Sequence, residues 1–249
     1  MLELKNIYKT FNPGTINEKR ALNGLNLKLN EGDFVTVIGG NGAGKSTMLN
    51  AVAGTWPVDE GQILIDNIDV TKLSEHKRAT YLGRVFQDPM TGTAATMGIE
   101  ENLALAKRRG KSRLLRSGIT KAEREEYKEL LKILGLGLED RLTSKVGLLS
   151  GGQRQALTLL MATLQKPKLL LLDEPAAGMN PNETLELMKT IRFVRDEFHM
   201  TILLIEHDMK LVSGICEKLT VLNFGQVLIQ GETSAVLKDP TVITAYLGE

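Results

Sequence analysis

Residues 39–47 combine the residue types that hold nucleotide phosphates. The segment fits the pattern G-x-x-x-x-G-K-S/T and consists of Gly39, Gly40, Asn41, Gly42, Ala43, Gly44, Lys45 and Ser46, followed by Thr47. Its glycines allow backbone N–H groups to close around β- and γ-phosphates without steric clashes. We expect Lys45 to give a positive charge to these phosphates and the Ser46 hydroxyl to ligate Mg²⁺. The segment therefore predicts a phosphate-binding loop.

Two carboxylates follow an apolar run later in the chain. Residues 169–172 are four consecutive leucines, and Asp173 and Glu174 come directly after them. Ligands of parallel sheets bind at the carboxyl ends of the strands. We expect Asp173 to hold Mg²⁺ through a water molecule, and Glu174 to orient and deprotonate an attacking water. Strands also end in acids at ordinary turns, but the phosphate-binding loop elsewhere in the chain favours the catalytic interpretation.

A second glycine-bearing segment, LSGGQ, precedes a predicted helix. It contains Ser150, Gly151, Gly152 and Gln153. A helix N-terminus at this point is also suited to contact phosphate. Because the chain already has one phosphate-binding loop, the second segment indicates a different nucleotide. We therefore expect a head-to-tail dimer, in which LSGGQ of each chain faces the ATP held by the other.

The elements that position these motifs follow from the apolar pattern. Residues 33–38 form a β-branched run typical of a buried strand, and residues 45–53 have helical composition. The phosphate-binding loop lies between them, a context that disfavours a chance glycine-rich turn. From residue 150 onward, predicted helices and strands alternate again, which indicates a largely parallel sheet covered by helices.

These motifs resemble those of the nucleotide-binding subunits of ABC transporters, over essentially all 249 residues. The resemblance implies an ATPase that takes ATP and Mg²⁺ and dimerises with itself or with a paralogous ATPase subunit. It also implies separate membrane-spanning permease subunits, with the chain bound peripherally at the cytoplasmic face of the cell membrane. A cytosolic ABC ATPase that powers a macromolecular assembly, such as iron–sulfur cluster assembly, is the alternative function.

The same resemblance assigns roles to residues outside the main motifs. Gln87, in the segment VFQDP, matches a glutamine that senses Mg²⁺ and the γ-phosphate, and His207 matches a histidine that contacts the γ-phosphate. Phe11 matches the aromatic residue that stacks on adenine, with Tyr8 as the nearby alternative. Residues 177–180, AGMN, depart from the family's usual S-A-L-D pattern, which weakens the expectation of a cross-dimer contact there.

The resemblance also divides the chain into two parts. From residue 173 to the end, the sequence resembles the ATPase subunits of branched-chain amino-acid importers, whereas residues 1–172 are more similar to another importer branch. A natural recombinant or a constructed hybrid would explain this division, and so would ordinary divergence. In either case the cargo that we expect is an amino acid or a similar small solute.

We expect an α/β fold with a P-loop core, an antiparallel β subdomain and an inserted α-helical subdomain. The whole chain, 1–249, is predicted to be one ABC ATPase domain, with residues 1–87 and 150–249 in the core and β subdomain and 88–149 in the helical subdomain. In the helical subdomain, Thr120 and Glu123 have the spacing of a capping box. Three apolar residues near its start could form a permease-docking groove or simply pack its core: Met90, Met97 and Ile99.

Composition narrows the classes of protein that remain. The chain has 31 Lys and Arg against 30 Asp and Glu, and 42% of its residues are hydrophobic, so disorder is excluded. It lacks the basic excess of a nucleic-acid-binding domain, and no nucleic-acid partner is expected. One cysteine fits a reducing compartment, and no apolar run approaches the ~20 residues that span a bilayer. Six basic residues at 107–116 indicate a solvated loop, or else a contact with lipid headgroups or a partner.

Overall fold

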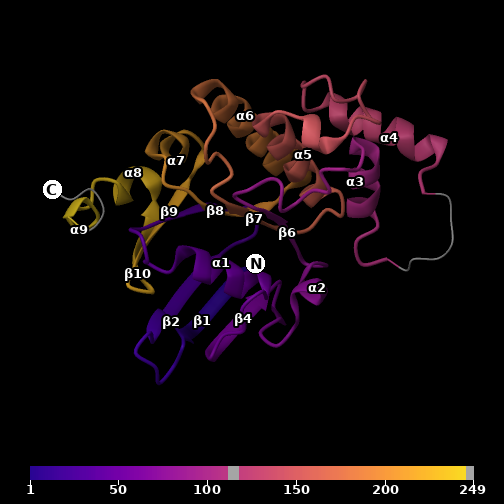
Figure 1. The fold of residues 1–249 in the computed structure, drawn as a ribbon. Helices are drawn as coiled ribbons and strands as arrows, with labels where there is room; N and C mark the ends of the chain where they lie inside the picture. The colour runs from indigo at the N-terminus through magenta and orange to yellow at the C-terminus, as the bar shows by residue number, and fades with distance from the viewer. Residues whose placement is uncertain (112–117, 245–249) are drawn as a thin grey trace.

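The computed structural model describes residues 1–111 and 118–244, which form two β-sheets with helices between and around them (Figure 1). The smaller sheet is antiparallel, with the strand order β2-β1-β4-β5. Its members are β1 (Leu2–Phe11), β2 (Lys19–Leu29), β4 (Glu60–Ile65) and β5 (Ile68–Asp69). This sheet is the antiparallel β unit that the sequence led us to expect.

The larger sheet has the strand order β10-β9-β3-β8-β7-β6. Its strands are β3 (Phe34–Ile38), β6 (Leu82–Val85), β7 (Leu169–Asp173), β8 (Thr201–Ile205), β9 (Lys218–Asn223) and β10 (Gln226–Glu232). All neighbouring pairs are parallel except β9 and β10. The central strands are buried on both faces, which explains why they appear in the sequence as continuous apolar runs.

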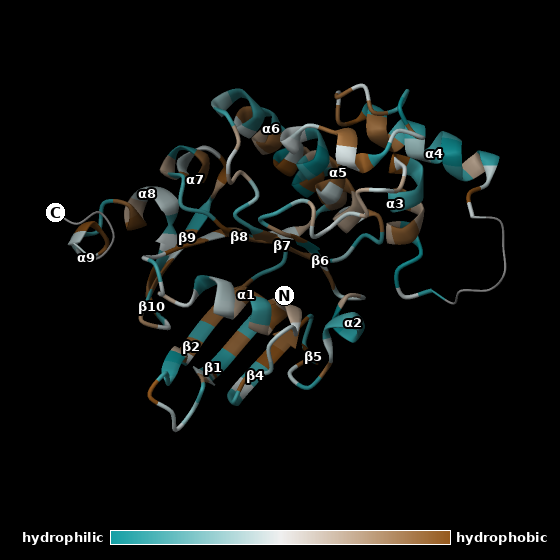
Figure 2. Cartoon of the chain, in the orientation of Figure 1, coloured by the Kyte–Doolittle hydropathy of each residue, from teal (hydrophilic) through white to brown (hydrophobic). Residues whose placement is uncertain are grey.

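Helices cover both faces of the larger sheet. On one face, α1 (Lys45–Ala53) packs into the apolar core that the two sheets share, and Figure 1 shows it between them. A second core on the opposite face joins the sheet to three helices: α5 (Gly151–Thr163), α6 (Pro181–Phe198) and α7 (Met209–Ile215). In Figure 2, brown and teal bands alternate along β1 and β2, whereas α4 is mostly teal. The layered α/β architecture is confirmed.

A separate apolar cluster holds together the helices that project beyond the sheet. It joins α3 (Ile99–Lys107), α4 (Lys121–Lys132) and the 3₁₀ turn η1 (Val146–Leu148) to the inner face of α5. The predicted capping box begins α4: Thr120 Oγ1 accepts a hydrogen bond from the Glu123 N–H at 3.2 Å, and a Glu123 carboxylate oxygen accepts one from the Thr120 N–H at 2.9 Å. Both partners therefore satisfy otherwise free backbone donors.

Short helices complete the chain: α2 (Glu75–Arg78), α8 (Thr233–Val236) and α9 (Pro240–Val242). Within the described ranges, no helix is both long enough and apolar enough to cross a membrane. Of the basic run at 107–116, Lys107 and Arg108 form ion pairs with two glutamates of α4, Glu126 and Glu123. Positions 112–116 of that run lie outside the described residues.

Candidate functional site

Four neighbouring parallel strands bring the predicted catalytic residues to one edge of the larger sheet. The phosphate-binding loop follows β3, His207 follows β8, Asp173 ends β7 with Glu174 directly after it, and Gln87 follows β6. Because these strands are parallel and lie in the order β3-β8-β7-β6, their carboxyl ends meet at the same edge. Segments far apart in the sequence therefore form one site.

The phosphate-binding loop needs glycine where other backbone lies too close for a side chain. A Cβ on Gly39 would lie 2.4 Å from the Leu222 carbonyl oxygen. Gly44 has a φ of 104°, and a Cβ there would lie 2.6 Å from the Ala21 carbonyl oxygen. Helix α1 begins at the next residue, and no described side chain caps its first turn. Its N–H groups therefore remain available to an anion.

Lys45 lies over this loop and close to the two carboxylates. Its ammonium donates to the carbonyl oxygens of Gly39 at 2.7 Å and Gly40 at 3.3 Å. Burial lowers the pKa of Lys45, and the charges of Glu174 and Asp173 oppose that shift. The ammonium is therefore held at the point where negatively charged phosphates would meet the loop.

Glu174 is the point at which the other predicted residues converge. Its Oε2 accepts a hydrogen bond from Gln87 Nε2 at 3.1 Å and lies 3.7 Å from His207 Nδ1. The Glu174 backbone has a φ of 42°, a strained value for a residue other than glycine, and its N–H donates to the Ile205 carbonyl oxygen at 2.9 Å. The structure thus places the glutamine, the carboxylate and the histidine in direct contact.

Asp173 contacts Arg84, a residue that belongs to none of the sequence motifs. The guanidinium of Arg84, on β6, lies 3.8 Å from the Asp173 carboxylate and also donates to the Asn50 side-chain oxygen at 2.9 Å. Burial raises the pKa of Asp173; Arg84 opposes this shift, Glu174 adds to it, and Lys45 opposes it. The two cations keep a buried carboxylate compensated beside the phosphate-binding loop.

Two further buried polar residues of the site, Gln155 and Glu206, belong to none of the motifs in the sequence. Gln155 lies two residues beyond Gln153 in α5, and Glu206 directly precedes His207. Gln155 is fully buried and Glu206 is 1% exposed. Their closeness to known motifs is the signal that could have identified them, since a buried glutamine or glutamate needs polar partners.

The geometry favours Phe11 over Tyr8 as the aromatic residue near the loop. Tyr8 packs across the sheet onto Gly24. A Cβ on Gly24 would lie 2.9 Å from the Tyr8 hydroxyl. Phe11 instead pairs across the strands with Lys19, whose ammonium lies 3.6 Å from the position of a Cβ on Gly42. The Phe11 ring also lies 5.0 Å, edge to face, from the ring of Trp56.

The LSGGQ segment lies apart from the phosphate-binding loop of the same chain. It forms the first turn of α5, and the described residues around the hollow that it lines, of about 190 Å³, include none of the loop. The hollow is shared with the first turn of α6, where a Cβ on Gly152 would lie 3.3 Å from Glu183 Cγ. Asn180, from the AGMN segment, caps α6 by accepting two backbone hydrogen bonds at 3.0 Å.

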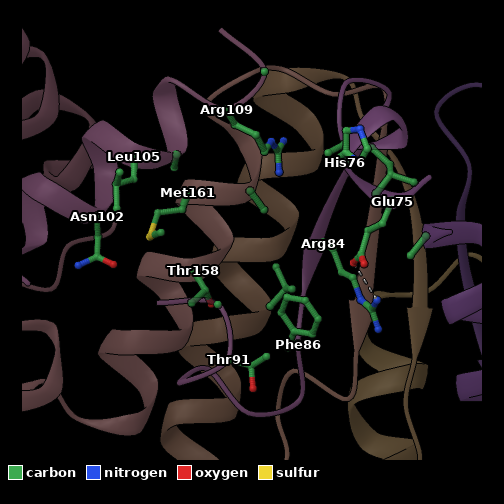
Figure 3. A pocket seen from close by; sticks show the side chains of 18 of the residues that line it. Glu75, His76, Arg84, Phe86, Thr91, Asn102, Leu105, Arg109, Thr158 and Met161 are labelled. Atoms are coloured by element: carbon green, nitrogen blue, oxygen red, sulfur yellow. Dashed lines mark ion pairs between the residues drawn. The ribbon is translucent and has the colours of Figure 1, made fainter. Parts of the chain in front are cut away.

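A cavity of about 770 Å³ lies between the edge strand β6 and the helices α3 and α5 (Figure 3). Leu105 and Met161 line it, and Figure 3 shows Arg109 above them on the same wall. Among the described residues, this lining includes Thr91, Gly92 and Ala94 but not Met90, Met97 or Ile99, and a docking groove at those three residues stays a prediction. Ile99 is fully buried in the cluster that joins α3, α4 and α5, because it begins the buried face of α3.

Comparison with known proteins agrees with this geometry. Residues 22–177 match the family model described as ABC transporter. The chain is 39% identical over 233 residues to the tyrosine transport ATP-binding protein of Clostridioides difficile, covering 92% of this chain and 91% of that protein. It is 38% identical over 237 residues to the high-affinity branched-chain amino acid transport ATP-binding protein BraF of Pseudomonas aeruginosa, covering 92% of each. Both similarities cross residue 172, so they do not require a hybrid chain.

Solved structures give the same result for the fold. An ATP-binding cassette of an ABC transporter in its ADP conformation matches with a TM-score of 0.84 at 30% identity, over 100% of this chain and 99% of the other. A dimeric cassette bound to ADP and phosphate in a post-hydrolysis state matches with a TM-score of 0.79 at 30% identity, over 93% and 98%. The chain belongs to the ABC transporter family and is its ATP-binding, ATP-hydrolysing subunit.

Proposed function

We propose that the chain is the ATP-hydrolysing motor of an importer for amino acids or similar small solutes. The observation that carries this proposal is the cluster of Gln87, Glu174 and His207 beside the phosphate-binding loop. Relatives named for tyrosine and for branched-chain amino acid transport support the class of cargo. They do not favour the alternative of a cytosolic assembly ATPase.

In this proposal the loop and the carboxylate have separate tasks. The free N–H groups of the first turn of α1 and the Lys45 ammonium bind the β- and γ-phosphates. Glu174 Oε2 accepts the proton of the attacking water, while Gln87 and His207 fix the position of that oxygen. The Phe11 ring contacts the adenine.

The residues beside the loop also fit Mg²⁺. The described residues contain no cluster of three or more His, Cys, Asp or Glu, so a metal held by protein carboxylates alone is not expected. Mg²⁺ prefers oxygen ligands and is usually held by one or two carboxylates together with substrate phosphates. Asp173, the Ser46 hydroxyl and the Gln87 amide oxygen supply such ligands. When bound, the ion would neutralise charge on the phosphates.

The second half of the nucleotide site comes from another copy or a paralogous subunit. Within one chain, the LSGGQ segment lines a different hollow from the loop, as described above. A head-to-tail dimer places Ser150–Gln153 of each chain against the ATP of the other. The dimeric post-hydrolysis cassette supports such an arrangement.

We assign the cavity beside β6 to the permease, with the chain at the cytoplasmic face of the membrane. Its lining combines apolar side chains, Leu105 and Met161, with the guanidinium of Arg109. A permease segment with apolar side chains and an acceptor for the guanidinium would fit this lining.

The variant Glu174→Gln tests the proposal. An amide cannot accept the proton, so hydrolysis is expected to slow by roughly 10²–10⁴-fold while ATP binding is retained. The variant should also accumulate as a dimer that holds two ATP molecules. Phosphate release and size-exclusion chromatography with ATP measure the two effects. Unchanged turnover together with a monomeric elution would refute both the role of Glu174 and the dimer.

A further inference from the structure

The peptide group between Pro175 and Ala176, one residue beyond Glu174, is held on both sides by buried side chains. The Pro175 carbonyl oxygen accepts a hydrogen bond from Gln155 Nε2 at 3.0 Å. In the same peptide group, the Ala176 N–H donates to Glu206 Oε1 at 3.2 Å. Both side chains are at most 1% exposed, and they come from different elements, α5 and the end of β8. We call this arrangement of Gln155, Glu206 and the Pro175–Ala176 peptide group the peptide clamp.

Each clamp residue also contacts a second loop of the site. Gln155 Nε2 donates to the Phe86 carbonyl oxygen at 3.2 Å, directly before Gln87. Glu206 Oε2 accepts the N–H of His207 at 3.1 Å. The peptide clamp therefore connects, through buried hydrogen bonds, the backbone on which Gln87, Glu174 and His207 all lie.

The orientation of the Gln155 amide is itself fixed. The Thr158 hydroxyl, one turn later in α5, shares its proton between the Gln155 backbone carbonyl oxygen at 2.8 Å and Gln155 Oε1 at 3.2 Å, which leaves the NH₂ group facing the two carbonyl oxygens. Figure 3 shows Thr158 on α5 on the side that faces Phe86. Because these groups are buried, removing a donor leaves carbonyl oxygens without a replacement from water.

We propose that Gln155 and Glu206 are positioning residues that fix the Glu174 carboxylate between Gln87 and His207. Because Gln155 lies in the helix that begins with Ser150–Gln153, the clamp also joins the LSGGQ turn to the catalytic carboxylate of the same chain. A shift of α5 when LSGGQ meets the partner's nucleotide would then move Glu174 directly. The inference rests on the proposed role of Glu174.

Gln155→Met provides the main test, because methionine has a similar volume and no donor. We expect kcat to fall about 10- to 100-fold, the usual effect of removing a hydrogen bond that positions a catalytic group. The Kd for ATP should be unchanged. In a Glu174→Gln chain the same substitution should cause no further loss, since both changes act on one carboxylate. Unchanged kcat, or losses that multiply in the double variant, would overturn the proposal.

Two matched threonines on α5 give a second test, because valine replaces threonine with little change in volume. Thr158→Val and Thr163→Val each remove a buried hydroxyl that donates to the carbonyl three residues earlier, at 2.8 Å in both cases. Only Thr158 also contacts the Gln155 amide. We expect similar thermal unfolding for the two variants but a lower kcat only for Thr158→Val. Equal kcat values would contradict the clamp even if Gln155→Met failed to fold.

Glu206→Gln tests the other side of the clamp. Glutamine has one acceptor oxygen, whereas the Glu206 carboxylate accepts the N–H groups of Ala176, His207 and Asp208. We expect the same fall in kcat with an unchanged Kd for ATP, and an unchanged kcat would remove Glu206 from the clamp. If Glu174→Gln alone left hydrolysis unchanged, the proposed function would fail. If Glu174→Gln slowed hydrolysis and the clamp variants did not, only this inference would fail.

Discussion

Two helices of this chain begin at glycine-bearing segments, but their first turns are satisfied in opposite ways. At α1, no described side chain caps the turn that follows Gly44. At α5, Ser150 Oγ accepts the Gln153 N–H and Gln153 Oε1 accepts the Ser150 N–H, both at 3.2 Å. The first turn of α1 therefore keeps its donors for an external anion, whereas the first turn of α5 is already stabilised by its own side chains.

The surroundings of the two turns differ as well. Beside α1 lie a lysine ammonium and the carboxylates of Asp173 and Glu174, to which we assign phosphate binding and hydrolysis. Beside the α5 turn lies a small hollow shared with Glu183 and the start of α6. In the proposed function, one chain supplies the binding and catalytic half of a site and presents Ser150–Gln153 as a separate surface. Two chains together would complete two such sites.

Among substitutions in the two turns, Ser150→Arg is expected to have the largest effect on hydrolysis. The long, charged side chain blocks the surface that faces the partner's nucleotide, so hydrolysis should fall by about 10²-fold or more. Binding of ATP to the chain's own loop should remain. Phosphate release and nucleotide titration measure the two quantities. Normal hydrolysis by this variant would show that LSGGQ does not contribute to the site.

Lys45→Ala is expected to have the complementary effect on binding. It removes the charge that meets the β- and γ-phosphates, and a charged hydrogen bond of this kind corresponds to an affinity loss of about 10- to 100-fold. Equilibrium titration with ATP measures the change in Kd. An unchanged Kd would mean that the loop does not hold the phosphates through this lysine.

The smallest effect is expected from Ser150→Ala, which removes the cap without adding bulk. Loss of a serine N-cap typically costs about 1 kcal/mol of stability, and chemical denaturation measures it. The variant also serves as a control for Ser150→Arg, because both lose the hydroxyl cap. If the two variants are equally destabilised and only Ser150→Arg loses hydrolysis, the added bulk causes that loss. A much larger destabilisation of Ser150→Arg would instead assign the loss to misfolding.

The sequence predicted the part of the site that depends on local patterns. The phosphate-binding loop has a fixed spacing, and strands that end in Asp173 or precede His207 have a clear apolar signal. The common edge of the sheet then follows from parallel topology. Gln87 and His207 came only from the family resemblance, yet the structure places both against Glu174. Their roles in hydrolysis stay predictions.

The remaining features depend on contacts between distant segments, which no local pattern encodes. Arg84 meets Asp173 only because β6 and β7 are neighbours in the sheet. Gln155 contacts the Phe86 carbonyl oxygen, 69 positions away in sequence. The docking groove expected at Met90, Met97 and Ile99 stays a prediction. Apolar residues near the start of α3 face the helical core, whereas Leu105, later in the same helix, lines the cavity.

The central claim is that each nucleotide site combines the loop of one chain with LSGGQ of another, and mixing the Ser150→Arg and Lys45→Ala variants, each impaired in a different part of the site, tests it most directly. In a mixed dimer, a Ser150→Arg chain supplies an intact loop and a Lys45→Ala chain supplies an intact LSGGQ, so one complete site is restored. A composite site therefore predicts that the mixture releases phosphate faster than the two variants measured separately. A rate equal to their average at every mixing ratio, with mixed dimers demonstrated, would contradict it.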